Sequence, residues 1–493
     1  MLPRKASDIF TIPAFRLSSC LPAVAGASED GEGSRLQSGH HANDGNAVNS
    51  ARAGSPSRLR EQRQLKTRAL APREWRIRGA DAAARRPSHG FMIVRARFIV
   101  TMDGPPIADG AVAVSNGRMV DVGPAAAVKA RNSGEITDLG EHVLLPGLIN
   151  AHCHLDYTCL RGRIRPPSAS FTDWILSINA AKADLSTNDY IASINDGFAE
   201  ARRFGTVAVA NLTAFPELIP QVQSLVRTTW FAELIDVRSP AAANEMVDRA
   251  MQLLEAAEDS GLSPHAPFTA SRKLYRRCVG AAKDGHRLRL TTHLAESRDE
   301  MAMFRDGTGP LYDFLQGIGR DMSDCGGQTP LAHFLSAVDT AQPWLVAHLN
   351  ELTESDFQLL AQTRPNLAVV HSPRSHRFFG HTAFPFAKLR ALGFNICLGT
   401  DSLASNQDLS LFAEMREFQS SFPEVAPGEI LSMATRNAAA ALGKSEVLGR
   451  VARGHFSDLI AVPFAGPEQA LFDAIVAFEG EPVAIGTGKA NQN

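Results

Sequence analysis

The chain has 493 residues, of which 44% are hydrophobic and 21% are charged, so it can build a sizeable folded core. Its formal net charge of −2 provides no general attraction to nucleic acid or to an anionic membrane. No apolar run reaches the roughly 20 residues that a membrane-spanning helix needs. The composition therefore argues against a protein with membrane-spanning helices, and we expect neither nucleic acid nor a membrane as a partner.

Six cysteines are scattered along the chain, and no two of them form a C-x-x-C pair. This spacing argues against a disulfide framework and against a zinc ribbon. It favours a reducing compartment, and we expect the protein in the cytoplasm.

Residues 1–91 differ in composition from the rest of the chain. They hold 15 Lys and Arg against 8 Asp and Glu, whereas the remainder holds 35 against 44. The segment is rich in Arg, Ser, Ala and Gly, so it cannot bury enough apolar surface to offset its ordering entropy. We expect a disordered tail or a misassigned start, with Met92 as the true initiator because it directly precedes the first strand pattern. An Arg- and Ser-rich targeting presequence is the remaining alternative.

From residue 92 onward the pattern changes to short β runs. Residues 92–104 and 110–123 alternate between apolar and polar side chains, and Asn116-Gly117 is typical of a hairpin turn. Short β runs return after residue 444. The two ends of this region are therefore predicted to pair into a small β domain.

Between these ends, apolar strand patterns alternate with helical ones such as 244–259. The strand patterns lie at 142–156, 206–213, 228–236, 261–267, 288–297, 344–351, 367–375 and 395–402. This alternation predicts an α/β fold with a (β/α)8 barrel at 147–443. A doubly wound sheet is the competing fold, but no G-x-G-x-x-G motif follows a strand.

Polar side chains stand where these strands end. His152 and His154 stand at the end of the first barrel strand. Side chains two residues apart on a strand point to the same face, so both imidazoles are directed as two ligands of one metal require. Other strands end in further residues of the same kinds: His265, His293, His348, His371 and Asp401. The carboxyl ends of parallel barrel strands converge on the face that carries active sites. We therefore predict a metal-centred site there, with independent structural histidines as the alternative.

These motifs together resemble the amidohydrolase superfamily, most closely its branch of aminohydrolases and chlorohydrolases that act on purines, pyrimidines and triazines. The resemblance covers nearly all of 92–493 and rests on PGLINAHCHLD, SPHAPFTAS, HLAES, HSPRSH and LGTDSLAS. It implies a distorted (β/α)8 barrel at 147–443 and a composite β-sandwich from both chain ends, 92–146 plus 444–493.

The resemblance also implies one divalent metal ion, zinc first and iron as the alternative. Its ligands would be His152, His154, His293 and Asp401. Binuclear members of the superfamily usually carry a carboxylated lysine at the end of the fourth strand. That strand reads GLSPHAP in this chain and has no lysine, which favours a single ion.

Catalytic roles follow from the same resemblance. A divalent ion lowers the pKa of a bound water to about 7, and Asp401 would take the proton while His348 aims the water. Glu296, three residues after His293, would protonate a ring nitrogen and pass the proton to the leaving amine. The alternative for Glu296 is a solvated glutamate that opens a helix.

Four residues are predicted to contact the substrate: His265, His371, Arg374 and Trp174. Trp174 would stack on an aromatic ring, with a place in the core as the alternative. Arg374 lies beside His376, where the family commonly has Asn, and this suggests an anionic or carbonyl-bearing substrate. Only Asp184 lies close to the position at which related nucleoside deaminases hold the ribose, so that contact stays open.

The sequence thus predicts a metal-dependent hydrolase that acts on carbon–nitrogen bonds other than peptide bonds in a small heterocyclic substrate. The first hypothesis is a hydrolytic deaminase of an aminopurine-like nucleoside or nucleobase, resembling the adenosine, S-adenosylhomocysteine, methylthioadenosine and aminodeoxyfutalosine deaminases. The second is cleavage of a cyclic amide, a urea or a carbon–halide bond by the same site. The third is a non-catalytic metal-binding protein. Members of the family are often oligomers, so homo-oligomerisation stays open.

Overall fold

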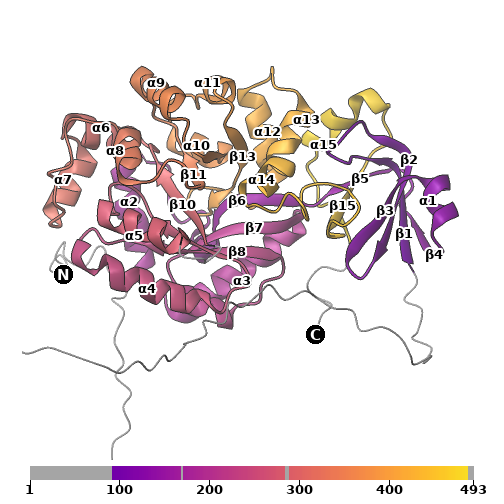
Figure 1. The fold of residues 1–493 in the computed structure, drawn as a ribbon, viewed down its shortest axis with the longest axis horizontal. Coiled ribbons are helices and arrows are strands. Elements are labelled where there is room, and N and C mark those ends of the chain that lie inside the picture. Colours follow the sequence, from indigo (N-terminus) through magenta and orange to yellow (C-terminus); the bar gives the residue numbers. More distant parts are fainter. Residues whose placement is uncertain (1–90, 168–169, 284–287, 487–493) are drawn as a thin grey trace, which may run out of the picture. The chain divides into compact units, whose positions relative to one another are not determined.

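The computed structural model describes residues 91–486, apart from 168–169 and 284–287. Two sheets organise this part of the chain, and helices surround the larger of them (Figure 1). No helix in the described part combines the length and the hydropathy that crossing a membrane requires. Residues 1–90, which hold nearly all of the predicted tail or misassigned start, lie outside the described residues.

The smaller sheet joins the two ends of the described chain. Its strand order is β16-β15-β5-β1-β2-β3, with β4 also paired to β1. The strands are β1 (Phe91–Ile99), β2 (Ile107–Ser115), β3 (Arg118–Pro124), β4 (Gly134–Asp138), β5 (His142–Pro146), β15 (Leu459–Pro463) and β16 (Val483–Ile485). The first half of β1 pairs with β4 and its last two residues pair with β5, so the sheet forks along β1. The predicted composite β domain is confirmed.

The larger sheet is parallel and runs β13-β12-β11-β10-β9-β8-β7-β6-β14. Its strands are β6 (Leu148–His154), β7 (Thr206–Thr213), β8 (Arg227–Leu234), β9 (Ser260–Pro264), β10 (Arg289–Leu294), β11 (Trp344–His348), β12 (Leu367–His371), β13 (Asn395–Leu398) and β14 (Asp401–Ser402). The last barrel strand is split, because β13 pairs with β12 whereas β14 pairs with β6. This split closes the ring and confirms the predicted distorted (β/α)8 barrel.

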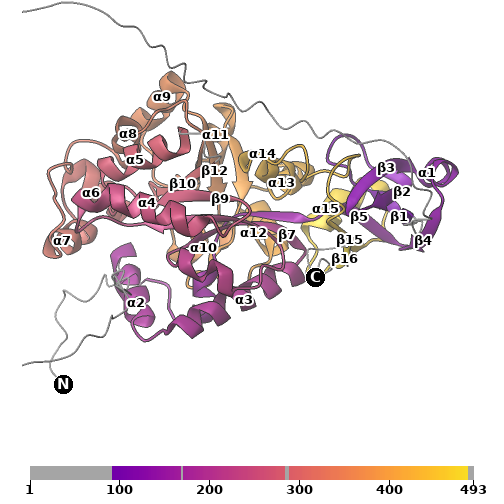
Figure 2. The same cartoon turned by 60° about the horizontal axis from the view of Figure 1, so that its bottom comes forward.

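Helices connect the barrel strands and cover them from outside (Figures 1 and 2). They are α2 (Phe171–Lys182), α3 (Thr187–Arg203), α4 (Ala243–Leu254), α5 (Arg272–Lys283), α6 (Arg298–Asp306), α7 (Pro310–Gly317), α8 (Pro330–Ala337), α9 (Glu354–Thr363), α10 (Pro373–Phe379), α11 (Phe386–Ala391), α12 (Leu411–Ser421), α13 (Pro427–Met433), α14 (Arg436–Ala441) and α15 (Leu471–Val476), with α1 (Ala125–Arg131) beside the smaller sheet. Local sequence sets their ends: Ser186 and Asp189 form a capping box that starts α3.

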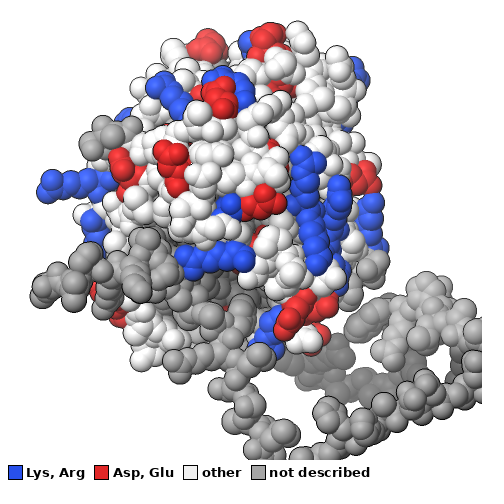
Figure 3. Space-filling view, turned by 90° about the vertical axis from the view of Figure 1, so that its left-hand side faces the viewer, with Lys and Arg blue, Asp and Glu red and all other residues white. Residues whose placement is uncertain are grey.

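Burial of the barrel strands explains their nearly continuous apolar sequences. Every residue of β6 is buried, since a parallel strand of a barrel is covered on both faces. Outside the barrel, basic and acidic side chains lie among one another on the face shown in Figure 3, in keeping with the small formal net charge. Because all barrel strands run in the same direction, their polar last residues meet at one end of the ring.

Candidate active site

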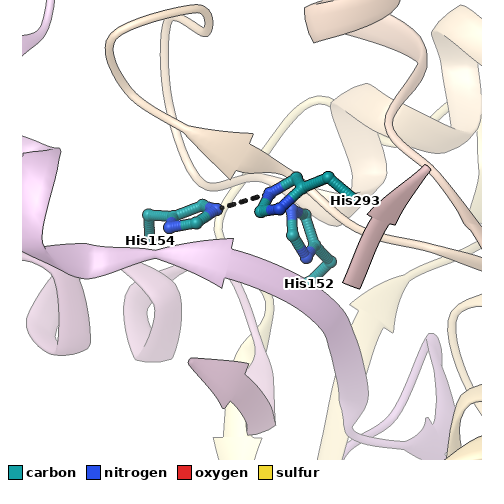
Figure 4. Close-up of side chains that lie close together, drawn as sticks. All are labelled: His152, His154 and His293. Atoms are coloured by element: carbon teal, nitrogen blue, oxygen red, sulfur yellow. Dashed lines mark hydrogen bonds between the residues drawn. The ribbon is translucent and has the colours of Figure 1, made fainter. Parts of the chain in front are cut away.

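Three imidazole rings meet at the carboxyl ends of β6 and β10 (Figure 4). Nε2 of His154 lies 3.1 Å from Nε2 of His293, and the ring centroid of His152 lies 5.0 and 4.9 Å from those of the other two. One ligand atom from each residue lies within 4.8 Å of the others, and all three residues are buried. Two tetrahedral Zn–N bonds place their nitrogens about 3.3 Å apart, so this spacing fits a shared cation.

Nε2 of His154 and Nε2 of His293 are hydrogen-bonded to each other (Figure 4), and the other hydrogen bonds of the rings are compatible with a metal at these nitrogens. Nδ1 of His293 donates to the backbone oxygen of His265 at 3.0 Å, so the lone pair of the ring is on Nε2. Both ring nitrogens of His152 are buried without a hydrogen-bond partner among the described residues. An unpaired buried polar group costs about 1–3 kcal/mol. These buried ring nitrogens are therefore better explained by a bound cation than by an apolar interior without one.

Asp401 adds a carboxylate to this cluster. Its Oδ1 lies 3.6 Å from Nε2 of His152 and 3.9 Å from Nε2 of His154. The hydroxyls of Ser375 and Ser405 donate to its other oxygen, Oδ2, at 2.6 and 3.2 Å. Burial opposes the charge of Asp401, but the neighbouring imidazoles, His152 foremost, hold the pKa of this carboxyl well below its usual value. Asp401 is therefore an anchored anion with one oxygen directed at the histidines.

Glu296 and His348 lie beside the same cluster. Oε1 of Glu296 is 3.6 Å from Nε2 of His348, and the rings of His348 and His293 are 5.4 Å apart. Burial raises the pKa of Glu296 well above its usual value, and the charges of Asp401 and Glu300 raise it further. Burial lowers the pKa of His348 well below its usual value. The site thus holds a carboxylic acid next to a neutral imidazole, which is the arrangement that proton transfer requires.

Unusual backbone conformations occur at three of these strand ends. Ala295, His348 and Asp401 have φ angles of +50°, +79° and +57°. Side chains other than glycine rarely adopt this region, and each instance costs roughly 1–3 kcal/mol. The backbone amides of Leu349 and Asn350 donate to the carbonyls of Leu294 and Ala295, which fastens the end of β11 to that of β10. The fold therefore holds the backbone in strained conformations at the positions that orient the site residues.

Two of the four residues predicted to contact substrate lie at further strand ends. The ring of His265 is 4.8 Å from that of His293, and its Nδ1 is 2.6 Å from Oγ1 of Thr269. His265 therefore borders the cluster. His371 is buried and stacks on Phe384 with a centroid distance of 4.0 Å. Its ring packs against the aromatic core behind β12.

Trp174 is part of an aromatic group on α2 and α10. Its ring lies 5.7 Å from that of Phe171 and 4.9 Å from that of Phe379. Its indole nitrogen is 3.5 Å from the carbonyl of Ala404, in the loop that follows Asp401. Trp174 is partly buried, so the structure places it at the rim of the site with packing contacts of its own.

The guanidinium of Arg374 is held by acidic side chains of the protein itself. Its Nη1 donates to Oδ1 of Asp408 at 2.6 Å and lies 4.0 Å from Oε1 of Glu414. The backbone nitrogen of Arg374 also donates to Glu414, at 3.0 Å. These contacts give Arg374 a structural position, where the sequence had suggested an anion-binding one.

Replacing Arg374 by Met should lower stability more than it affects substrate binding. The variant removes the charge-assisted hydrogen bond to Asp408, and such a bond contributes about 1.5–3 kcal/mol. Urea unfolding measures the loss, and steady-state kinetics should show an unchanged KM. A raised KM at unchanged stability would instead restore the substrate contact predicted from the sequence.

Glu300 supports Glu296 from a fully buried position. Its Oε2 accepts a hydrogen bond from the backbone nitrogen of Glu296 at 2.8 Å, whereas Oε1 has no partner in the described part of the chain. Burial raises the pKa of Glu300 from 4.5 to about 8. The folded protein therefore keeps a proton on this group at pH values at which the unfolded chain has lost it.

This proton makes stability depend on pH. The stabilisation is complete below the unfolded pKa and is lost as pH rises through the folded value of about 8. We expect urea-unfolding free energies to fall between pH 5 and pH 9, and the fall to be smaller in Glu300→Gln, which keeps the accepting oxygen. Parallel pH profiles for the wild type and this variant would contradict the assignment.

Sequence reasoning missed Glu233, at the end of β8. Its Oε1 lies 3.9 Å from Nδ1 of His154 and is buried without a hydrogen-bond partner among the described residues. Glu233, His265 and His293 form a second group whose ligand atoms lie within 4.8 Å of one another. His293 belongs to both groups, and because its Nδ1 donates to the backbone oxygen of His265, only its Nε2 can bind a metal, so the groups are alternative positions for one cation. The sequence feature that could have identified Glu233 is its position near the end of a strand, which it shares with the histidines.

The barrel and its buried histidine–carboxylate cluster define an enzyme built around a cation site. Residues 143–484 match the amidohydrolase family, and residues 110–132 match the imidazolonepropionase-like composite domain of bacteria. The chain belongs to the amidohydrolase family.

Individual relatives agree with this assignment. A 5-methylthioadenosine/S-adenosylhomocysteine deaminase from Syntrophobacter fumaroxidans is 32% identical over 386 residues, which is 74% of this chain and 82% of that protein. An adenosine deaminase structure from Xanthomonas campestris with bound zinc has a TM-score of 0.67 at 25% identity, covering 79% of this chain and 90% of that one. The Helicobacter pylori aminofutalosine deaminase in complex with methylthio-coformycin shares the fold, with a TM-score of 0.69 at 20% identity over 80% of this chain and 100% of that one.

Proposed function

We propose that this protein is a hydrolytic deaminase that replaces the amino group of an adenine-like nucleoside by oxygen and releases ammonia. The observation that carries the proposal is the position of Glu296, a buried acid with a raised pKa, beside His348 and the histidine–Asp401 cluster. Family membership makes it a hydrolase of carbon–nitrogen bonds. The relatives named as deaminases of 5-methylthioadenosine, S-adenosylhomocysteine and adenosine support the choice of substrate.

The ligands proposed for one divalent ion are His152, His154, His293 and Asp401. We propose zinc because a compact set of imidazole and carboxylate ligands suits it. A single ion is supported by the lack of lysine in β9 and by the sharing of His293 between the two candidate ligand groups. When bound, such an ion lowers the pKa of water toward 7 and makes hydroxide available at neutral pH.

Protons then move between residues of the chain and the substrate. Asp401 removes a proton from the attacking water, whose oxygen bonds to the ring carbon that carries the amino group. Glu296 donates its proton to the adjacent ring nitrogen, which lets that carbon accept the oxygen. The proton on Asp401 then passes to the amino group. As the carbon–nitrogen bond breaks, the remaining hydroxyl proton returns to the Glu296 carboxylate, so neutral ammonia leaves, a carbonyl is left behind, and both side chains regain their starting protonation. His348, neutral through burial, accepts a hydrogen bond from the water and orients it.

Ammonia release from a panel of adenosine, 5′-methylthioadenosine and S-adenosylhomocysteine tests the proposal on the zinc-loaded full chain. We expect one ammonia for each inosine-type product, with the new oxygen derived from isotopically labelled water. Hydrolysis of a cyclic amide, a urea or a halide without any ammonia from the aminopurines would contradict it and assign the same site to another bond.

A further inference from the structure

A buried asparagine side chain links the strand of His152 to the segment that carries Asp401. Asn150 lies two residues before His152 on β6 and is fully buried. Its Nδ2 donates to the hydroxyl of Thr400 at 2.7 Å, and its Oδ1 accepts from the backbone nitrogen of Thr400 at 3.2 Å. Oδ1 also accepts from the backbone nitrogen of His152 at 3.3 Å. One side chain therefore contacts the backbone at one proposed metal ligand and directly before another.

These hydrogen bonds lie where the last barrel strand is split. Gly399 and Thr400 are the two residues that separate β13 from β14. The backbone approaches β6 closely here, because a Cβ at Gly399 would lie 2.8 Å from the carbonyl oxygen of His152. The backbone nitrogen of Thr400 donates to that same oxygen at 3.1 Å. Asn150 therefore adds side-chain hydrogen bonds at the interruption between β13 and β14.

The hydroxyl of Thr400 extends this contact to Asp401. Its Oγ1, which accepts from Asn150, donates in turn to the backbone oxygen of Asp401 at 3.3 Å. Nδ2 of Asn406 donates to the carbonyl of Thr400 at 2.8 Å. The φ of +57° at Asp401 is a strained conformation, which persists where the surrounding structure fixes it. Two buried amide side chains thus fix the backbone before Asp401, and Asn150 is the one that belongs to the strand of His152.

The ring of His152 depends on the same contact for its position. The register of β6 against β7 shifts between Asn150 and Cys153, and within the described residues His152 has no paired residue on β7. Neither ring nitrogen of His152 has a hydrogen-bond partner in the described part of the chain. The ring is therefore placed through its backbone, and Asn150 accepts the hydrogen bond of that backbone nitrogen.

We propose that Asn150 is a positioning residue that sets the distance between the ring of His152 and the carboxylate of Asp401, and thereby the affinity of the site for its cation. This inference rests on the proposed function and adds a residue outside the proposed ligand set. The distance concerned is 3.6 Å between Nε2 of His152 and Oδ1 of Asp401. Removing a group that orients metal ligands typically costs about 10- to 100-fold in metal affinity or activity.

The zinc affinity of the full chain tests this assignment without reference to turnover. Competition with a chromophoric chelator gives the Kd, and urea unfolding of the zinc-free protein gives the stability of each variant. We expect Asn150→Ala to weaken zinc binding by about 10- to 100-fold. Thr400→Val removes only the hydroxyl contact and should weaken zinc binding by about 10-fold. Thr400→Ser restores the hydroxyl and should keep the wild-type Kd.

A double variant tests whether the two side chains act through one contact. Asn150→Ala combined with Thr400→Val should bind zinc as Asn150→Ala does, because the first change already removes the hydrogen bond that the second removes. Losses of zinc affinity that simply add would show that the two side chains act independently, which contradicts the proposed link.

Asn437→Ala is the matched control. Its side-chain amide also donates to the split strand, at the backbone oxygen of Ile396 at 3.0 Å, but near the amino end of β13. The control should lower the free energy of unfolding and leave the Kd for zinc unchanged. This result separates a general loss of stability from a loss of alignment at the site.

A wild-type Kd for zinc in Asn150→Ala overturns the inference and leaves Asn150 a structural residue. If Asn150→Ala shows no cooperative unfolding transition, the comparison of Thr400→Val with Thr400→Ser decides, and equal Kd values for these two variants overturn it. Ammonia release is scored separately. A wild type that binds zinc more tightly than Asn150→Ala but releases no ammonia from the aminopurines would contradict the proposed deaminase and support the role of Asn150.

Discussion

Replacing Glu296 by Gln should lower kcat by about 10²- to 10⁴-fold while zinc content and fold stay those of the wild type. The amide keeps the shape of the side chain 3.6 Å from His348 but cannot give a proton to a ring nitrogen. The pH profile adds a second expectation. Because the pKa of Glu296 is raised, wild-type activity needs the protonated form and falls on the alkaline side, and the residual activity of the variant should lack this limb.

Glu354→Gln is the matched control for this experiment, since Glu354 is exposed and paired with Lys388 far from the cluster. It should leave both kcat and zinc content unchanged. Near-wild-type turnover in Glu296→Gln would show that Glu296 is only a buried structural carboxyl. Loss of zinc together with loss of turnover would place it among the groups that maintain the cation site.

Replacing Asp401 by Asn should weaken metal binding by more than about 100-fold and abolish turnover at ordinary zinc concentrations. The substitution removes the negative charge whose oxygen lies 3.6 Å from His152, and with it the acceptor proposed for the proton of water. The hydroxyls of Ser375 and Ser405 can still bond to the amide, so the fold should persist. Competition with a chromophoric chelator measures zinc affinity, and circular dichroism checks the fold.

Two outcomes distinguish the roles of Asp401. Activity that returns in Asp401→Asn at saturating zinc would show that the carboxylate acts only as a ligand. Unchanged zinc affinity with lost turnover would show that it acts only on the proton. The proposed mechanism requires both effects.

Much of the barrel was predictable because its strands are short, apolar and bounded by turn residues. The predicted 206–213 strand coincides with β7, and Asn116 and Gly117 adopt the positive φ angles, +51° and +70°, that a tight hairpin requires. The meeting of His152, His154, His293 and Asp401 followed from the common direction of parallel strands, and the structure brings them together. Their roles as ligands stay a proposal.

The remaining features of the site depend on contacts between residues that are far apart in the chain, and no local sequence pattern reveals such contacts. Arg374 lies next to a strand end like the histidines, yet Asp408, 34 residues later, takes its charge. Glu233 shares the strand-end position but lacks a recognisable motif. The role of each of these residues therefore depends mainly on the side chains that the fold places beside it.

X-ray diffraction at the zinc absorption edge, on crystals of the zinc-loaded full chain, tests the cation site most directly. We expect one anomalous peak per chain, about 2.0–2.2 Å from nitrogens of His152, His154 and His293 and from an oxygen of Asp401. A second peak of equal height, or a single peak that leaves out any of these four side chains, would contradict it.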